Sequence, residues 1–486
     1  MPDNEKSDSL GLTLAIGFLK LLDKNELREF DRFVHSPFFN NRSEVSSYFD
    51  VIKKYYPDFS HKEFTKENVF AELYPGTAFR DDVIRRLNSN LFKLGEEYGA
   101  YTSRRKNEFE YEKDLLNFYF TKNADKSFKK QLRNIEGFLE SQEINDPEYF
   151  YNLSTLNEIE RNQMLKYDPT YKRSGFEKQI VNHWKYLLSS MLRLYGFGEY
   201  EKFFFNKEYE LKYADELQHI ATSSNFMGSV AIEIYYRAFR LYAESNNDDD
   251  FHKLKQLIKD NTALFSKNEL FHLYIHLFNY CNINKLKKDV DYSRVEFEIS
   301  KEMIEKEMII NNGVIDPGWF RGIFFKIFNA GEIKFAEEYI NKYRSAVSGN
   351  DSENVVNHAL AQLAMHKKDY SKALEYLAKA TYQHINDKWL IKNIYLKIFY
   401  ETGSYEEFYY TVDSIRHLIK EEGSWNENLI TPIRNFITHA SKLFRIKQKE
   451  TDIPVDEVRH EILTSKTIGR QWLLEKTDEI ENASKS

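Results

Sequence analysis

The chain has 486 residues, of which 42% are hydrophobic and 30% charged, the composition of a folded protein rather than a disordered one. Its formal net charge of −7 disfavours a broadly basic surface for nucleic acid. The single cysteine, Cys281, excludes a disulfide within the chain and every multi-cysteine zinc motif, and it fits a reducing compartment.

Glycine and proline are scarce, with 18 and 9 residues, so the sequence carries few turn signals and few helix breakers. The prolines after Pro2 are interpreted as lying where the helical pattern pauses: Pro37, Pro57, Pro75, Pro147, Pro169, Pro317, Pro432 and Pro454. The sequence therefore predicts an all-α protein.

No run of about 18 apolar residues occurs, so no transmembrane helix is expected. The first apolar run, Leu10–Leu22, is interrupted by Lys20 and follows acidic residues, which does not match the pattern of a signal peptide. We therefore expect a cytoplasmic protein without a membrane partner.

Residues 1–104 are predicted to form an N-terminal module of short amphipathic helices. Asp23, with Glu26 three positions later, has the pattern of a capping box, and Thr65 has that of a second N-cap. A longer helix is expected to begin at Asp81 or Asp82, because acidic residues suit the first turn of a helix.

Residues 105–310 are predicted to form irregular helical hairpins. Asn246–Asp250 is a polar connector whose acids favour the start of the next helix over a cation loop, since no spaced loop with a terminal Glu follows. The aromatics of Phe203–Phe205 would point in three directions from a helix and therefore predict an element buried on several sides.

A metal site is one alternative that this region raises. His272 and His276 are four residues apart and share a helical face, with Glu269 three positions earlier and Cys281 nearby. Glu-x-x-His spacings also occur at Glu216/His219 and Glu457/His460. These spacings are only a small excess over chance in a Glu-rich chain, so we expect no metal, no cofactor and no catalytic residues.

The stretch Pro317–Ile419 contains one helical hairpin three times in succession. The expected turns are Asn329–Ile333, His366–Tyr370 and Glu401–Tyr405, each between two apolar helices. Taking the last residue of each turn as equivalent gives spacings of 37 and 35 residues, within the range of helix-turn-helix solenoids. We predict helical-hairpin repeats forming an α-solenoid, with repeats and a capping hairpin over 311–447 and a C-terminal helix and polar tail over 448–486.

These units resemble tetratricopeptide repeats (TPRs). The resemblance rests on small and large residues near the family's spacing, which in the middle unit are Leu360, Ala361, Ala364, Tyr370, Ala373, Leu377 and Ala380. The first unit offers Ile323, Ile327, Gly331, Ala336 and Ile340, and the third Tyr395, Phe399, Gly403, Tyr405 and Val412. Phe408 replaces an expected small residue, and the family's helix-ending proline is missing from all three units.

The resemblance implies a concave groove, lined by the first helix of each unit, that holds a peptide. The residues that match groove positions are Arg321, Asn329, His358, Gln362, His366, Asn393, Lys397 and Glu401. Mixed polar residues there suit hydrogen bonding to a peptide. The other interpretation is the solvated face of a curved scaffold. Phe325 and Gln362 stand where the family's carboxylate clamp would use asparagine.

The first alternative to a binding scaffold is a DNA-binding transcriptional regulator, and a metal-dependent helical-bundle enzyme is the second. Thr65–Tyr98, with Leu73-Tyr74-Pro75 and Arg85-Arg86, faintly resembles the helical part of winged-helix proteins. Basic and acidic residues balance over 60–110, whereas phosphate binding needs a basic excess, so nucleic acid is an unlikely partner. We therefore predict a non-catalytic scaffold or adaptor that binds a protein or peptide.

Overall fold

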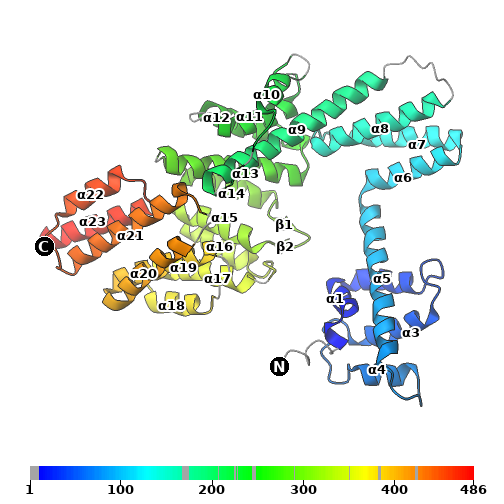
Figure 1. The fold of residues 1–486 in the computed structure, drawn as a ribbon, viewed down its shortest axis with the longest axis horizontal. Helices are drawn as coiled ribbons and strands as arrows, with labels where there is room; N and C mark the ends of the chain where they lie inside the picture. The colour runs from blue at the N-terminus through cyan, green and yellow to red at the C-terminus, as the bar shows by residue number, and fades with distance from the viewer. Residues whose placement is uncertain are drawn as a thin grey trace. The chain divides into compact units, whose positions relative to one another are not determined.

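The computed structural model describes residues 10–166, 175–205, 207–208, 210–223, 226, 228–243, 248–288, 290–349, 351–380, 385–421 and 425–485. In these residues the protein is helical apart from one β-hairpin with two residues in each strand, which confirms the predicted all-α class (Figure 1). None of the described helices is long and apolar enough to cross a membrane. The chain divides into two compact units, Met1–Leu139 and Glu140–Ser486.

The N-terminal unit is organised around one long helix. Its helices are α1 (Leu14–Leu21), α2 (Lys24–Val34), α3 (Ser43–Ile52), α4 (Lys66–Leu73), α5 (Asp81–Lys106), α6 (Glu108–Thr121) and α7 (Asp125–Ser141). Ile84, Leu87, Leu91 and Leu94 recur at helical spacing on α5 and are buried. Helices α1 to α4 all pack on α5. The predicted domain boundary at residue 104 therefore lies inside α5.

The predicted caps of this unit form. The Asp23 carboxylate accepts hydrogen bonds from the backbone N–H groups of Asn25 and Glu26, and the Glu26 side chain accepts one from the Asp23 N–H, which completes the capping box. The Thr65 hydroxyl accepts from the Asn68 N–H at the start of α4. Each bond satisfies a backbone donor that the first turn of a helix leaves unpaired.

The first helices of the second unit are α8 (Pro147–Leu165), α9 (Gly175–Phe204), α10 (Ala214–Ala221), α11 (Val230–Ala243), α12 (Asp248–Asp260), α13 (Lys267–Lys288) and α14 (Ser293–Glu305). Helix α9 contacts α8, α10, α11 and α13. Asp248, Asp249 and Asp250 lie in the first turn of α12, as predicted, and the buried Asp250 carboxylate pairs with Arg237 and Arg240. The earlier part of that connector, residues 246–247, lies outside the described residues.

A short β-hairpin separates α14 from the repeats. Strands β1 (Ile310–Asn311) and β2 (Val314–Ile315) are antiparallel. Asn312 and Gly313, which join them, both have positive φ, the conformation in which an Asn-Gly pair makes a tight hairpin turn. The all-α prediction included no strands, so this hairpin is a small correction to it.

Three helical hairpins follow: α15 (Pro317–Asn329) with α16 (Ile333–Tyr343), α17 (Ser352–His366) with α18 (Tyr370–Ala378), and α19 (Ile385–Thr402) with α20 (Tyr405–Glu421). Each predicted turn lies between two helices, and Ile333, Tyr370 and Tyr405 each begin the second helix of a hairpin. Gly331, Lys368 and Gly403, two residues before these, all have positive φ. The first helices contact one another in succession, α15 with α17 and α17 with α19.

The chain ends with α21 (Glu427–Lys447), α22 (Val455–Thr464) and α23 (Arg470–Lys485), and α23 packs on both α21 and α22. The predicted boundary at 447 coincides with the end of α21. Pro432 lies inside α21, so its interpretation as a pause in the helical pattern is wrong. It is the sixth residue of the helix and is buried among the apolar residues of the last hairpins.

The far end of α9 contacts the start of α21. The Asn426 and Asn428 side-chain amides donate hydrogen bonds to the Phe203 carbonyl oxygen at 2.6 and 2.9 Å, and Phe205 forms an isolated β-bridge with Trp425. Phe204 is buried, and Phe205 packs against the apolar core of the C-terminal hairpins. The aromatic run of Phe203–Phe205 therefore lies at a junction between the first and last helices of this unit.

Candidate functional site

Two of the predicted groove residues lie in the core. His358 on α17 is 1% exposed and its ring packs edge-on against Phe325 of α15, 5.2 Å between centroids. Burial, helped by the charge of Arg321, lowers the pKa of His358 to about 3, so the ring is neutral. Gln362, one turn later, is also buried. His358 thus packs between two hairpins, and neither buried side chain can line a solvated wall.

The chain's own last helix covers the groove positions on α19. Glu401 pairs with Lys476 of α23 at 2.6 Å, and Lys476 also pairs with Glu479. The Lys397 amino group lies over the rings of Trp472 and Phe436, 5.4 and 5.8 Å from their centroids. This end of the predicted groove therefore already contacts α23. Asn393, one turn before Lys397, is half-buried.

The remaining predicted groove residues stay accessible. Asn329 and His366 are exposed at the ends of α15 and α17, and Arg321 is half-buried one turn after the start of α15. The His366 ring meets the edge of Phe328 at 5.6 Å. The structure thus leaves Asn329 and His366 exposed and Arg321 and Asn393 half-buried. His358 and Gln362 are buried, and Lys397 and Glu401 contact α23. Their role in peptide binding stays a prediction.

An apolar groove of about 780 Å³ lies elsewhere, between α19 and α20. Ile391, Tyr395 and Phe399 from one face of α19 line it, and Tyr410 of α20 stands opposite, 78% exposed. The other lining residues are polar or small: Ala380, Lys388, Lys392, Glu406, Glu407, Thr411 and Ser414. Helix α18 has 9 residues and α20 has 17, so within the described residues α18 does not flank α20 along its whole length.

The groove has a charged end on α19. Lys392 donates a hydrogen bond to the Ser414 hydroxyl across the groove, and Lys388 lies one turn earlier, exposed to solvent. Burial, together with the charge of Lys388, lowers the pKa of Lys392. Glu406 and Glu407 lie at the opposite end, in the first turn of α20.

This groove was not among the predicted sites, although the two helices that form it were predicted. Lys388, Lys392, Tyr395 and Phe399 form a stripe at spacings of three and four along one helical face, a signal that was available. The same stripe is equally typical of a buried helix face. Periodicity indicates which side chains share a face but not which of them neighbouring helices leave exposed.

The predicted alternative of a metal site at His272 and His276 is replaced by a buried polar network. Glu269 pairs with Arg193 of α9 at 2.5 Å. His276 is fully buried, stacks on Phe197 at 4.4 Å, and its Nδ1 is hydrogen-bonded to the Tyr242 hydroxyl at 3.0 Å. Burial lowers the pKa of His276 to about 3, so it is a neutral core histidine.

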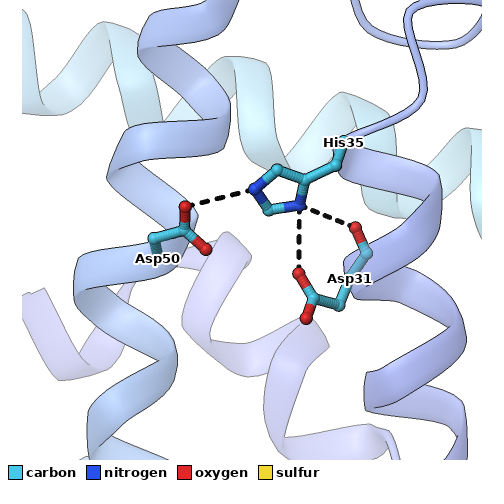
Figure 2. A group of neighbouring side chains, drawn as sticks. All are labelled: Asp31, His35 and Asp50. Atoms are coloured by element: carbon cyan, nitrogen blue, oxygen red, sulfur yellow. Dashed lines mark hydrogen bonds and ion pairs between the residues drawn. The ribbon is translucent and has the colours of Figure 1, made fainter.

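Among the described residues, the group whose side chains could come together on a metal ion is Asp31, His35 and Asp50 (Figure 2). His35 Nδ1 lies 3.0 Å from an Asp31 carboxylate oxygen, and His35 Nε2 lies 3.1 Å from Asp50. The Lys53 amino group contacts both carboxylates as well. The Lys53 ammonium, joined by the His35 ring when it is protonated, thus balances the two acids, which makes the cluster a cross-link between the ends of α2 and α3.

Replacing His35 by glutamine is expected to remove a small pH-dependent stabilisation of α2 and α3. The pKa of His35 is raised, first by its bond to the Asp31 carbonyl and then by the two carboxylates. Its contribution is therefore full below pH 6.5 and is lost as the pH rises through the higher folded pKa. Because the ring is 40% exposed, we expect less than about 1 kcal/mol.

Hydrogen exchange of α2 and α3 amides in the full chain at pH 5.5 and 8.5 measures this effect. Wild type should lose protection relative to the His35→Gln variant as the pH rises. An unchanged difference between the two proteins across this range would show that the cluster does not stabilise the folded state.

The arginines that suggested a DNA-reading helix are paired with carboxylates. Arg80 pairs with Asp82, Arg85 with Asp81, and Arg86 with Glu44. Residues 65–98 form α4 and the first two thirds of α5, and α5 itself continues to Lys106 where a wing would need strands. The three arginine side chains are 58–66% exposed, so these are surface ion pairs, and DNA binding by this module stays an alternative prediction.

Comparison with known proteins identifies no relative. No protein-family model, no curated protein and no solved structure matches the chain.

Proposed function

We propose that the protein is a non-catalytic scaffold of TPR-like helical hairpins, stacked as an α-solenoid, that binds a segment of another protein. The proposal places it in the cytoplasm, where the buried thiol of Cys281 stays reduced. The observation that carries the proposal is the open apolar groove between α19 and α20, because large exposed apolar and aromatic surfaces on soluble proteins mark interaction sites.

The hairpin arrangement supports this proposal. The three units share the turn position and have a positive-φ residue at the same place in each turn, and each first helix packs on the next. Stacked repeats of this kind provide extended binding surfaces without needing a catalytic centre. The accessible residues Asn329 and His366 offer a second, polar contact region.

Site-specific photo-crosslinking in the native host tests the proposal. A photoreactive phenylalanine analogue in place of Tyr410 should capture a partner protein by its covalent adduct, because this side chain is exposed on the groove. The matched control carries the analogue in place of Tyr111, which is 44% exposed on α6. Adducts at 410 and not at 111 would support a binding groove. Identical adducts from both positions, or none from 410, would contradict it.

A further inference from the structure

Charge is separated along the groove. Helices α19 and α20 form a hairpin, so they run in opposite directions, and the Lys392–Ser414 bond fixes their register. Lys388 and Lys392 therefore lie at one end of the groove, and Glu406 and Glu407 lie at the other, beside Phe399. From Lys388 to Phe399 the helix rises by about 16 Å at 1.5 Å per residue, which corresponds to about three helical turns.

The lysine end carries a local charge conflict. Lys388 is the fourth residue of α19 and lies near the positive end of the helix dipole. The dipole favours acidic side chains at this position, so the positive charge of Lys388 is disfavoured there. Lys392 follows one turn later, where burial and then the nearby charge of Lys388 disfavour its charged form. An anionic group docked here would meet the two lysines that line this end of the groove.

The glutamate end has the opposite preference. Glu406 and Glu407 lie in the first turn of α20, where they suit the dipole of their own helix and also present two carboxylates to the groove. Between the two ends the walls are apolar or aromatic, with Ile391, Tyr395, Phe399 and Tyr410. A matching occupant is therefore apolar in the middle, basic at one end and acidic at the other.

We propose that the groove takes an amphipathic helical segment of a partner protein, bound with its C-terminal, acidic end at Lys388 and Lys392. The segment runs antiparallel to α19, so its positive N-terminal end meets Glu406 and Glu407, and its negative C-terminal end meets the lysines. Its apolar side chains, spaced at i, i+4 and i+7, enter the groove as in other helix-in-groove complexes. The inference rests on the proposed function and adds the partner's chemistry and direction.

Selection from a displayed library of 15-residue helical peptides on the full-length chain tests the inference. Enriched peptides should carry apolar residues at i, i+4 and i+7, with Asp or Glu concentrated toward the C-terminal end. Tyr410→Ala should weaken the best peptide about tenfold or more, as loss of an aromatic contact at an interface does. Tyr111→Ala is the matched control and should leave its affinity unchanged.

Charge reversal tests the direction of binding. Lys388→Glu should weaken the acid-ended peptides about fivefold, and parallel selection on this variant should enrich Lys or Arg at the C-terminal end instead. Lys253→Glu, the same change at an exposed lysine of α12, should alter neither result. Both lysines are solvent-exposed, so neither change should disturb folding.

The outcomes separate the two proposals. If the Tyr410→Ala change leaves the affinity of the enriched peptides unchanged, the peptides bind elsewhere. That result would contradict the groove as the binding site but not peptide binding by the protein. Peptides that need Tyr410 but show no charge bias would overturn the direction. Self-association of the full chain that Tyr410→Ala abolishes would assign the groove to a second copy and overturn a separate partner. A library that yields no binder would count against the proposed function itself.

Discussion

Replacing Glu296 by alanine is expected to lower the free energy of unfolding of the second unit by about 3–5 kcal/mol. Glu296 lies on α14 and is 1% exposed, and its carboxylate pairs with Lys326 of α15 at 2.5 Å and with Lys285 of α13. Removing it leaves two ammonium groups facing each other at the edge of the core without their common partner. Three neighbouring helices lose their shared ionic contact.

Glu298→Ala provides the matched control, because Glu298 is on the same helix and also pairs with a lysine, Lys255 at 2.8 Å. Its side chain is 48% exposed, so solvent screens the pair and we expect a loss of less than about 1 kcal/mol. The measurement is the urea dependence of hydrogen exchange in α13 to α15 of the full chain. Equal losses in the two variants would contradict a buried ionic centre at Glu296.

Replacing Lys397 by methionine is expected to stabilise the second unit at pH 7 by about 1–3 kcal/mol. Burial lowers the pKa of Lys397 to about 8, with the carboxylates of Glu475 and Glu401 opposing the shift. Methionine keeps the apolar stem that packs on Trp472 but removes the cost of holding a charge there. The change therefore acts through desolvation of the amino group.

The pH dependence of this effect has a defined sign. An unfolded lysine titrates at about 10.5, so between pH 8 and 10.5 the unfolded state holds a proton that the folded state has lost. Wild type gains stability as the pH rises through this window, and the advantage of Lys397→Met should shrink toward zero. Hydrogen exchange of α19 and α23 at pH 7 and 9.5 measures it, with Lys420→Met on the surface of α20 as control. A destabilised variant at pH 7 would show that the contact with Trp472 outweighs the desolvation.

The repeat boundaries could be predicted from the sequence because they depend on local signals. Gly331 and Gly403 supply the positive φ that each turn needs, and the apolar helix faces on both sides give the period of 3.6 residues. Asp23 and Thr65 likewise cap the helices they were expected to cap, since an N-cap bond spans only three residues. Pro432 was interpreted as a helix break because proline usually interrupts a helix, but it lies buried inside α21.

The candidate site could not be predicted in the same way, because it depends on which faces tertiary contacts cover. His358 and Gln362 carry polar side chains, yet the packing of α17 on α15 buries them. Lys397 and Glu401 are in contact with α23. The residue spacing within the repeats does not indicate that α23 packs there. Tyr395 and Tyr410 line a groove between α19 and α20, and the spacing of apolar residues within each helix does not indicate which side chains the packed helices leave accessible.

The contact between α9 and α21 has a consequence for how the chain folds as it leaves the ribosome. The Phe203 carbonyl oxygen accepts a hydrogen bond from the side-chain amide of Asn426, which lies 223 residues later in the chain. The junction can therefore form only after most of the second unit has been synthesised. Pairings of such long sequence separation form late, because closing a long loop costs entropy before the contact is gained. The hairpins from α15 to α20 can pack on one another as each is synthesised. The C-terminal end of α9 gains its contacts with Asn426 and Asn428 only after those residues have been synthesised.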